Sequence, residues 1–239
     1  MLALAIAIPL AFISGSIPCG LLIARARGVD IRAHGSGNIG ATNVWRVCGR
    51  APGLACFSLD VAKGLVPTAA AGLAAGTFAQ ADLPPRLAWL WLAVAAAAIL
   101  GHMFTPWAGF RGGKGVATGF GALLGIFPLL TFPALAALVV WLVVARLSRY
   151  VSLASIAAAA SLPVWLFVTV ELLSDHPGGH RAALPFYVAI ALLAAAVILK
   201  HRGNIGRLLQ GSENRIGRRV DACPPKAASR TPPDGGVGR

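Results

Sequence analysis

Long apolar stretches alternate with short polar connections along most of the chain. Six stretches are almost entirely apolar, and they cover residues 1–24, 51–81, 87–106, 116–145, 152–173 and 185–199. About 20 apolar residues in a helix suffice to cross the hydrocarbon core of a bilayer. Polar and basic segments lie between or after them, at residues 25–50, 107–115, 146–151 and 200–239. The pattern predicts an all-α, polytopic transmembrane protein.

The stretch 116–145 decides the number of spans. Pro128 and Pro133 lie in its middle, and two such prolines break a helix, so we predict two short spans that meet there and seven spans in all. With seven spans, 18 of the 21 Lys and Arg residues fall on one side of the membrane. The positive-inside rule makes that side cytoplasmic, with the N-terminus outside and the C-terminus inside. A re-entrant hairpin over 116–145 would keep the same parity.

The two ends of the chain differ in character. Residues 1–24 could be read as a signal peptide or lipoprotein leader, but no basic residue precedes them, and Pro18 stands where cleavage before Cys19 needs a small residue. After about residue 219 the sequence becomes rich in proline, glycine and charge. We therefore expect one integral-membrane domain over residues 1–219 and a disordered cytoplasmic tail over residues 220–239.

Composition narrows the class of protein further. Hydrophobic residues make up 57% and charged residues 12% of the 239 residues, whereas soluble domains carry about 25% charged residues. A net charge of +13 would suggest a nucleic-acid partner for a soluble protein. In so apolar a chain it indicates the cytoplasmic rim of a membrane instead. The four cysteines have no C-x-x-C spacing, so we expect no zinc site.

The first polar cluster, residues 34–46, has glycines spaced as G-x-G-x-x-G. As a dinucleotide motif this is weak, because no strand precedes it. Glycines nevertheless let backbone N–H groups converge on an anion. Short polar groups and a guanidinium suited to phosphate lie among them, namely Ser36, Gly37, Asn38, Thr42, Asn43 and Arg46. We favour an anion-binding loop over the alternative, a polar loop with a helix cap at Thr42 or Asn43.

The second polar cluster, residues 109–118, carries Gly112-Gly113-Lys114-Gly115 at the start of an apolar run. It is not a Walker A loop, which needs glycine where Ala108 stands and Ser or Thr where Gly115 stands. A glycine turn that enters a helix is still a reasonable phosphate cradle, because its N–H groups can face the anion. The alternative is a flexible basic loop at the membrane surface.

The third polar cluster, residues 200–213, places His201 and Asn204 three residues apart. That spacing puts both side chains on one face of a helix. The alternative is an amphipathic helix whose basic side chains reach toward the lipid headgroups. Within an apolar stretch, Asp60 and Lys63 are also three apart, which predicts an intramembrane ion pair.

The histidines outside the third cluster are not expected to bind metal. His34 and His102 have no evident partner in the sequence, and we interpret both as structural. His176 and His180 have helical spacing, but Pro177-Gly178-Gly179 lies between them and spoils a helical metal site. Ser152, which opens the sixth span, has a plain alternative role as a helix cap.

At this point the clusters resemble a known family. Residues 36–46 closely resemble the first motif of the bacterial acyl-phosphate-dependent glycerol-3-phosphate acyltransferases. Residues 112–118 look like the second motif and residues 201–213 like the third, while residues 15–20, 60–64 and 152–156 also fit. The motifs occur in the family's order and all lie on the predicted inner face. The resemblance runs from about residue 10 to residue 217.

The resemblance implies a multispan enzyme of the bacterial inner membrane with its active site on the cytoplasmic side. It implies transfer of a fatty acyl group from acyl phosphate to the 1-hydroxyl of sn-glycerol 3-phosphate, which gives lysophosphatidic acid and phosphate at the first step of phospholipid synthesis. Acyl phosphate is a mixed anhydride with a good leaving group, so no metal, cofactor or covalent enzyme intermediate is required. The implied partners are the two substrates and membrane lipid, with no nucleic acid and no obligate protein partner.

The resemblance also suggests roles for the clustered residues. Because both substrates carry phosphate, cations and N–H donors must offset their repulsion. We expect His201, Ser36 and Asn204 to place glycerol 3-phosphate and its attacking hydroxyl group. We assign phosphate binding and support of the site to Gly37, Asn38, Thr42, Asn43, Arg46, Lys63, Gly113, Lys114, Ser152, Arg207 and Glu213. Whether His201 or the substrate's own phosphate takes the proton is left open here, and Glu213 is expected to hold a cation in place.

Other functional classes fit the sequence less well. Acyltransferases that use acyl-CoA or acyl carrier protein carry H-x-x-x-x-D, and no His in this chain has Asp five residues later. A transporter for organic phosphates would need polar groups along a path through the bilayer, and few ionisable residues lie inside the later spans. A non-catalytic scaffold would not explain the clustered glycines and amides.

Overall fold

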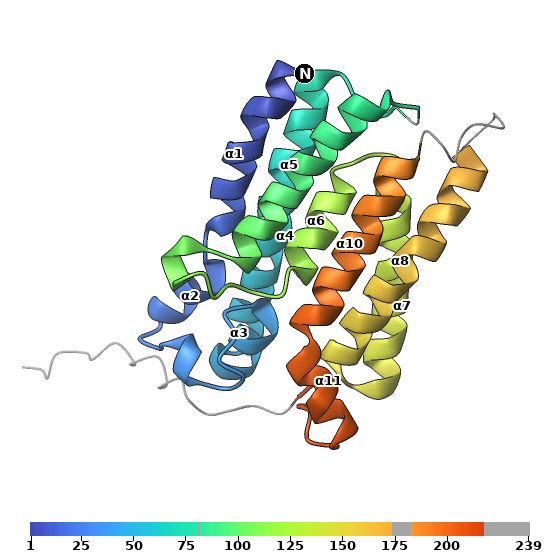
Figure 1. Cartoon of the computed structure of the whole chain (residues 1–239). Helices are drawn as coiled ribbons and strands as arrows, with labels where there is room; N and C mark the ends of the chain where they lie inside the picture. Colours follow the sequence, from blue (N-terminus) through green and yellow to red (C-terminus); the bar gives the residue numbers. More distant parts are fainter. Residues whose placement is uncertain (81, 174–182, 218–239) are drawn as a thin grey trace, which may run out of the picture.

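The computed structural model describes residues 1–80, 82–173 and 183–217, and the described part of the chain is helical without strands. Two 3-10 turns, Ile31–Ala33 and Pro106–Ala108, lie between the helices (Figure 1). The α-helices are α1 (Leu2–Ser16), α2 (Cys19–Arg25), α3 (Ala41–Cys48), α4 (Arg50–Ala75), α5 (Pro85–Met103), α6 (Val116–Leu124), α7 (Thr131–Ser148), α8 (Val151–Leu173), α10 (Leu184–Lys200) and α11 (Arg202–Leu209). The predicted all-α architecture is confirmed. The predicted tail and the pair His176 and His180 lie outside the described residues.

The helices match the apolar stretches of the sequence closely. Within the described residues, five helical segments are long and apolar enough to cross a membrane, or six if α10 and α11, bent by 55° at His201, count as one span. α6 has nine residues and is therefore about 14 Å long, less than half of the roughly 30 Å hydrocarbon core. The count of seven spans and the orientation of the chain therefore stay predictions.

The predicted break within residues 116–145 is present, but only one of the two prolines lies in it. α6 ends at Leu124 and α7 begins at Thr131, so Pro128 lies in the connection. Pro133 lies in the first turn of α7, where the missing N–H costs no helical hydrogen bond. The chain therefore bends before the position that the two prolines together predicted.

The first apolar stretch is also broken, at Ile17 and Pro18, between α1 and α2. The ammonium group of Lys63 in α4 donates a hydrogen bond of 2.8 Å to the carbonyl oxygen of Ile17. The same ammonium lies 2.8 Å from Asp60 Oδ1. The ion pair predicted from the sequence is thus present, and its ammonium adds a second donor to the Ile17 carbonyl oxygen, which also accepts the N–H of Cys19 at 3.0 Å.

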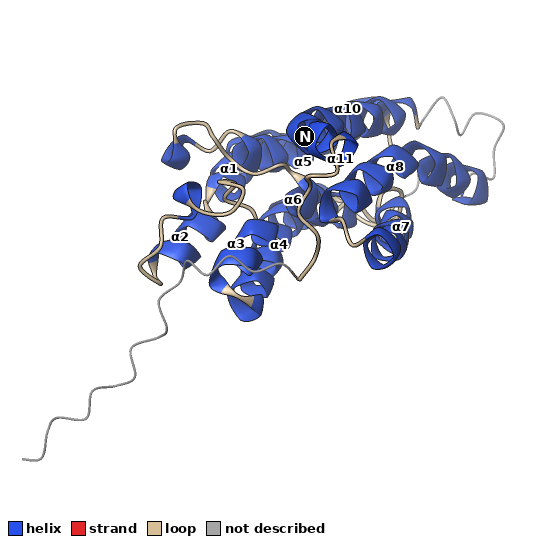
Figure 2. Cartoon of the chain, turned by 90° about the horizontal axis from the view of Figure 1, so that it is seen from below, coloured by secondary structure: helices blue, strands red, loops and turns tan. Residues whose placement is uncertain are grey.

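Glycines allow close helix crossings in the bundle. A Cβ added to Gly15 of α1 would lie 2.0 Å from the carbonyl oxygen of Ala98 in α5. A Cβ added to Gly121 of α6 would lie 2.0 Å from the carbonyl oxygen of Val61 in α4. Small residues at such crossings are typical of membrane bundles. α7 and α8 lie side by side next to this group of helices (Figures 1 and 2).

The polar clusters gather at one end of the bundle. α2, α3, α11 and the turn between α7 and α8 lie at the lower end in Figure 1, whereas α5 begins at the opposite end. This arrangement brings together segments that are far apart in the sequence. A functional site is therefore expected at the polar end.

Candidate active site

A polar pocket of about 150 Å³ opens at the end of the bundle where the clusters meet. Its lining comes from all three polar clusters and from the start of α8. It includes most of the residues selected from the sequence, namely Ser36, Asn38, Thr42, Asn43, Arg46, Lys114, Ser152, His201, Asn204, Arg207 and Glu213. The structure thus places residues more than 170 positions apart in the chain around one cavity.

The loop before α3 is held in shape by Asn43. The Asn43 side chain is 2% exposed. Its oxygen accepts the N–H of Ser36 at 2.9 Å, and its amide nitrogen lies 3.0 Å from the carbonyl oxygen of His34 and 2.9 Å from that of Asn38. Asn43 therefore organises the loop around the pocket, with Gly40 at the N-cap position of α3.

The glycines of this loop meet a conformational need. Gly35 and Gly37 have φ values of +63° and +69°, in the left-handed region that other residues avoid. Asn38 Oδ1 accepts the N–H of Gly40 at 2.8 Å, which closes a turn at the pocket rim. Neither Thr42 nor Asn43 is the N-cap of α3. The loop thus presents the short side chains of Ser36 and Thr42 at its surface.

A chain of hydrogen bonds links the second and third clusters. Lys114 Nζ donates to Asn204 Oδ1 at 2.6 Å, and Asn204 Nδ2 donates to Glu213 Oε1 at 2.7 Å. Ser152 Oγ donates to the same Glu213 oxygen at 2.8 Å, so it does not serve as a plain helix cap. Arg207 Nε donates to Glu213 Oε2 at 2.7 Å. Glu213 thus fixes an amide, a hydroxyl and a guanidinium on one wall of the pocket.

The charges of the pocket favour an anion. Burial lowers the pKa of Lys114 to about 8. Burial alone would raise the pKa of Glu213, but hydrogen bonds from Asn204, Ser152 and Arg207 bring it below its ordinary value. Among the described residues, Arg46 and Lys114 form no ion pair with a carboxylate. These two cations are therefore available for a ligand.

His201 lies at the bend between α10 and α11 and is 2% exposed. Its Nδ1 atom is 2.8 Å from the carbonyl oxygen of Val197. Because a carbonyl only accepts, Nδ1 must carry the proton in the neutral ring. Nε2 is then a hydrogen-bond acceptor, which suits an incoming hydroxyl group.

Three of the residues selected from the sequence do not line the polar pocket: Gly37, Lys63 and Gly113. Lys63 pairs with Asp60, which does line it. The N–H of Gly113 donates to the carbonyl oxygen of His102 at 3.1 Å, so it is already engaged within the protein. These three residues, which we expected to bind phosphate or support the site, do not contact the cavity directly.

The sequence reading also omitted residues that line the pocket, above all Asp60 and His102. His102, interpreted as structural, has its Nδ1 atom 3.6 Å from Asp60 Oδ1. The sequence predicts Asp60 only as half of an ion pair with Lys63. The one signal for His102 was its position shortly before the second cluster.

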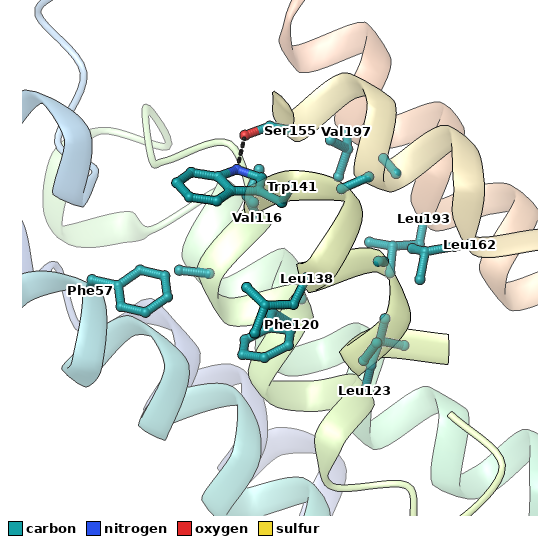
Figure 3. A pocket seen from close by; sticks show the side chains of 17 residues that line it. Phe57, Val116, Phe120, Leu123, Leu138, Trp141, Ser155, Leu162, Leu193 and Val197 are labelled. Carbon is teal, nitrogen blue, oxygen red and sulfur yellow. Dashed lines mark hydrogen bonds between the residues drawn. The ribbon is translucent and has the colours of Figure 1, made fainter. Parts of the chain in front are cut away.

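A second, apolar pocket of about 120 Å³ adjoins the polar one. Figure 3 shows Phe57 of α4, Phe120 of α6, Leu138 of α7, Leu162 of α8 and Leu193 of α10 around it. The two pockets share the residues Phe57, Val116, Ala117, Trp141 and Ser155.

The junction of the two pockets is fixed by a hydrogen bond in which Trp141 Nε1 donates to Ser155 Oγ at 3.1 Å (Figure 3). The combined site therefore has one part for an anion and one part for a hydrocarbon chain.

Comparison with known proteins identifies the family. A family model described as glycerol-3-phosphate acyltransferase matches residues 5–211. The protein of that name from Geobacter sulfurreducens is 48% identical over 207 residues, which cover 86% of this chain and 94% of that protein. The one from Thermosynechococcus vestitus is 44% identical over 213 residues, which cover 87% and 92%.

Solved structures agree with the sequence comparison. The crystal structure of PlsY, an integral membrane glycerol 3-phosphate acyltransferase, in its glycerol 3-phosphate form has a TM-score of 0.75 and 38% identity to this chain. The match covers 90% of this chain and 96% of that one. The lysophosphatidic acid form of PlsY gives a TM-score of 0.73 at 37% identity with the same coverage. The resemblance found in the motifs is thereby confirmed, and the chain belongs to the glycerol-3-phosphate acyltransferase family as a multi-pass integral membrane enzyme.

Proposed function

We propose that this enzyme transfers a fatty acyl group from acyl phosphate to the 1-hydroxyl of glycerol 3-phosphate. The hydroxyl oxygen forms a bond to the acyl carbonyl carbon, and the bond between that carbon and the phosphate oxygen breaks. The products are lysophosphatidic acid and inorganic phosphate. The solved relative in its lysophosphatidic acid form supports this product.

The proposal rests mainly on one observation: the polar and apolar pockets adjoin and share five lining residues. Acyl phosphate joins an anion to a hydrocarbon chain at a single carbonyl group. If the phosphate occupies the polar pocket and the chain the apolar pocket, the carbonyl lies at the junction beside Trp141 and Ser155. The acyl chain would enter sideways between the helices from the bilayer.

The residues of the polar pocket would then act by position and charge. Arg46 and Lys114, which have no carboxylate partner among the described residues, hold the phosphates. His201 Nε2 accepts a hydrogen bond from the attacking hydroxyl and orients it, while Ser36 and Asn204 help to place glycerol 3-phosphate. The proton ends on the departing phosphate.

The remaining selected residues support this site. Thr42 and Asn38 extend the phosphate surface at the rim, while Asn43 and Gly37 shape the loop. Glu213 holds Arg207, Ser152 and Asn204 in place through the hydrogen bonds described above.

We further propose that the polar end of the bundle faces the cytoplasm of a bacterium across its inner membrane. The basic segments that meet at this end support that orientation through the positive-inside rule. The N-terminus then lies outside. A cysteine-labelling experiment with a membrane-impermeant thiol reagent on intact cells tests it, because a cysteine introduced at exposed Arg111 should be protected until the cells are opened.

The decisive test is release of phosphate from synthetic acyl phosphate by the purified protein. We expect release that depends on glycerol 3-phosphate and matches the lysophosphatidic acid formed. Acyl-CoA and acyl carrier protein thioesters serve as donor controls and should give no product. Equal transfer from a thioester would overturn the assignment of the donor.

The roles of single residues can be tested in the same assay. Lys114→Ala and Arg46→Ala should each abolish most activity, and near-normal turnover in both would refute the phosphate cradle. For the proton, His201→Gln is compared with His201→Ala. Because glutamine can still accept a hydrogen bond, its retention of most activity would support orientation, whereas equal loss in both would point to proton abstraction by His201.

A further inference from the structure

His102 lies between a buried ion pair and the glycine-rich loop that carries Lys114. It belongs to the last turn of α5 and is 5% exposed. It lines the polar pocket together with Asp60. No part of the proposed chemistry uses it. His102 is thus a buried imidazole at the polar pocket that has no role in the proposed reaction.

Beneath the ring, a buried network fixes its position. His102 Nδ1 is 3.6 Å from Asp60 Oδ1, and that oxygen is 2.8 Å from Lys63 Nζ. Lys63 also donates to the carbonyl oxygen of Ile17, and the thiol of Cys56 donates to Asp60 Oδ2 at 3.6 Å. Because breaking a buried ion pair is costly, the ring stands on a rigid base.

Above the ring, the glycine-rich loop lies in direct contact with His102. A Cβ added to Gly113 would stand 2.0 Å from His102 Nε2. The N–H of Gly113 donates to the carbonyl oxygen of His102 at 3.1 Å, and the N–H of Gly112 donates to that of Met103 at 3.3 Å. The absence of a side chain at Gly113 therefore lets the loop approach the Nε2 end of the imidazole ring closely.

We propose that His102 is a positioning residue that sets the height of the glycine-rich loop and thereby the place of the Lys114 ammonium in the polar pocket. The inference rests on the proposed role of Lys114 in holding phosphate. Lys114 directly follows Gly113 and reaches Asn204 across the pocket. A displacement of about 1 Å at a reacting group costs on the order of 100-fold in rate, so the loop must be held closely.

A compensating pair of substitutions tests the contact. Gly113→Ala should lower kcat/KM for glycerol 3-phosphate at least tenfold, because its methyl group pushes the loop off the ring. Adding His102→Ala removes the ring that the methyl group meets. We expect the double variant to be at least several-fold more active than Gly113→Ala alone. A double variant that is no better, or in which the two losses multiply, would overturn the proposal.

Gly112→Ala is the matched control. A Cβ at Gly112 would stand 2.0 Å from the carbonyl oxygen of His102, which His102→Ala leaves in place. His102→Ala should therefore not restore the activity of Gly112→Ala. Equal recovery at both glycines would show general loosening of the protein and would contradict a specific contact with the ring.

A pH profile separates positioning from mere stability. If His102→Ala displaces Lys114 toward solvent, the alkaline limb of kcat/KM should move to higher pH, because less burial raises the pKa of the ammonium. A loss of folded protein alone would lower the profile without moving it. His102→Val also removes the ring that meets Gly113 while leaving an apolar side chain, and it provides the same measurement if the alanine variant fails to fold. An unmoved limb in the folded variant refutes the proposal.

Failure of this inference can be told apart from failure of the proposed function. If wild-type protein gives no release of phosphate that depends on glycerol 3-phosphate, the proposed function fails. If wild-type protein is active but the double variant shows no recovery, only the role of His102 fails.

Discussion

The ammonium group of Lys114 should give the enzyme an alkaline limit near pH 8. Burial lowers the pKa of this group to about 8, and only the charged form can hold a phosphate. With that pKa, about 90% of the free enzyme is charged at pH 7 and about 10% at pH 9. Because kcat/KM reports ionisations of the free enzyme, it should fall about tenfold per pH unit well above pH 8.

Lys114→Arg isolates this ionisation. A guanidinium stays charged across the whole range, so the variant, although less active overall, should keep a flat profile up to about pH 9.5. Release of phosphate from acyl phosphate is measured from pH 6 to 10 at low glycerol 3-phosphate. The ratio of the two profiles cancels the titration of the substrates. Lys200→Arg is the control, since Lys200 lies over the ring of Phe104 at the end of α10. The Lys200→Arg variant should keep the alkaline limb of its kcat/KM profile near pH 8. Identical limbs in wild type and Lys114→Arg would refute the reasoning.

Substitutions at three further positions probe other parts of the site. Asn43→Ala removes the hydrogen bonds of this side chain to the backbone of Ser36, His34 and Asn38, each worth about 0.5–1.5 kcal/mol net, so kcat/KM should fall at least tenfold while circular dichroism stays unchanged. Glu213→Gln keeps an acceptor for Ser152 but loses the ion pair with Arg207, which is 40% exposed, so a loss of about tenfold is expected, and Glu213→Ala should lose more. Trp141→Ala opens the junction of the pockets and should raise KM for acyl phosphate but not for glycerol 3-phosphate. Trp89→Ala, at a side chain 45% exposed on α5, is its control and should change neither.

The apolar pattern predicted the helices well, but the prolines did not show where they break. Pro9, Pro67 and Pro163 lie inside helices, whereas breaks occur at Pro18 and Pro128. A break in an apolar environment needs partners for the carbonyl groups it frees. Lys63 supplies one to Ile17, and the N–H of Ala79 supplies one to Phe127 at 3.1 Å. These donors are more than 40 residues away in the sequence, so no local pattern reveals them.

The polar clusters of the candidate site could be found from the sequence, because amides, hydroxyls and cations are rare in so apolar a chain. Their meeting place followed from the sidedness of the basic segments. The wall shared with the apolar pocket could not be found in this way. Trp141 lies within the long apolar sequence of α7, and only packing shows that it faces Ser155.

The second cluster does lie at the pocket, as the motif predicted, but its glycines serve a different purpose from the one we expected. We expected their N–H groups to face an anion, as in other phosphate cradles. In the structure the N–H groups of Gly112 and Gly113 bond to the end of α5, and a Cβ at either position would collide with His102. Glycine is needed here for close approach to a protein group, and the positive charge comes from the neighbouring Lys114.

The two carboxylates of the polar pocket explain why a count of basic residues overstates the charge that a ligand meets. Asp60 holds Lys63, and Glu213 holds Arg207, so each neutralises a cation within or beneath the pocket. Of the Lys and Arg side chains that line the polar pocket, Arg46 and Lys114 remain without such a partner among the described residues. A phosphate group carries a charge of about −1.5 to −2 at neutral pH, so the phosphates of the two proposed substrates together would exceed the charge of these two cations. The excess negative charge would favour departure of the phosphate product once the acyl group has moved.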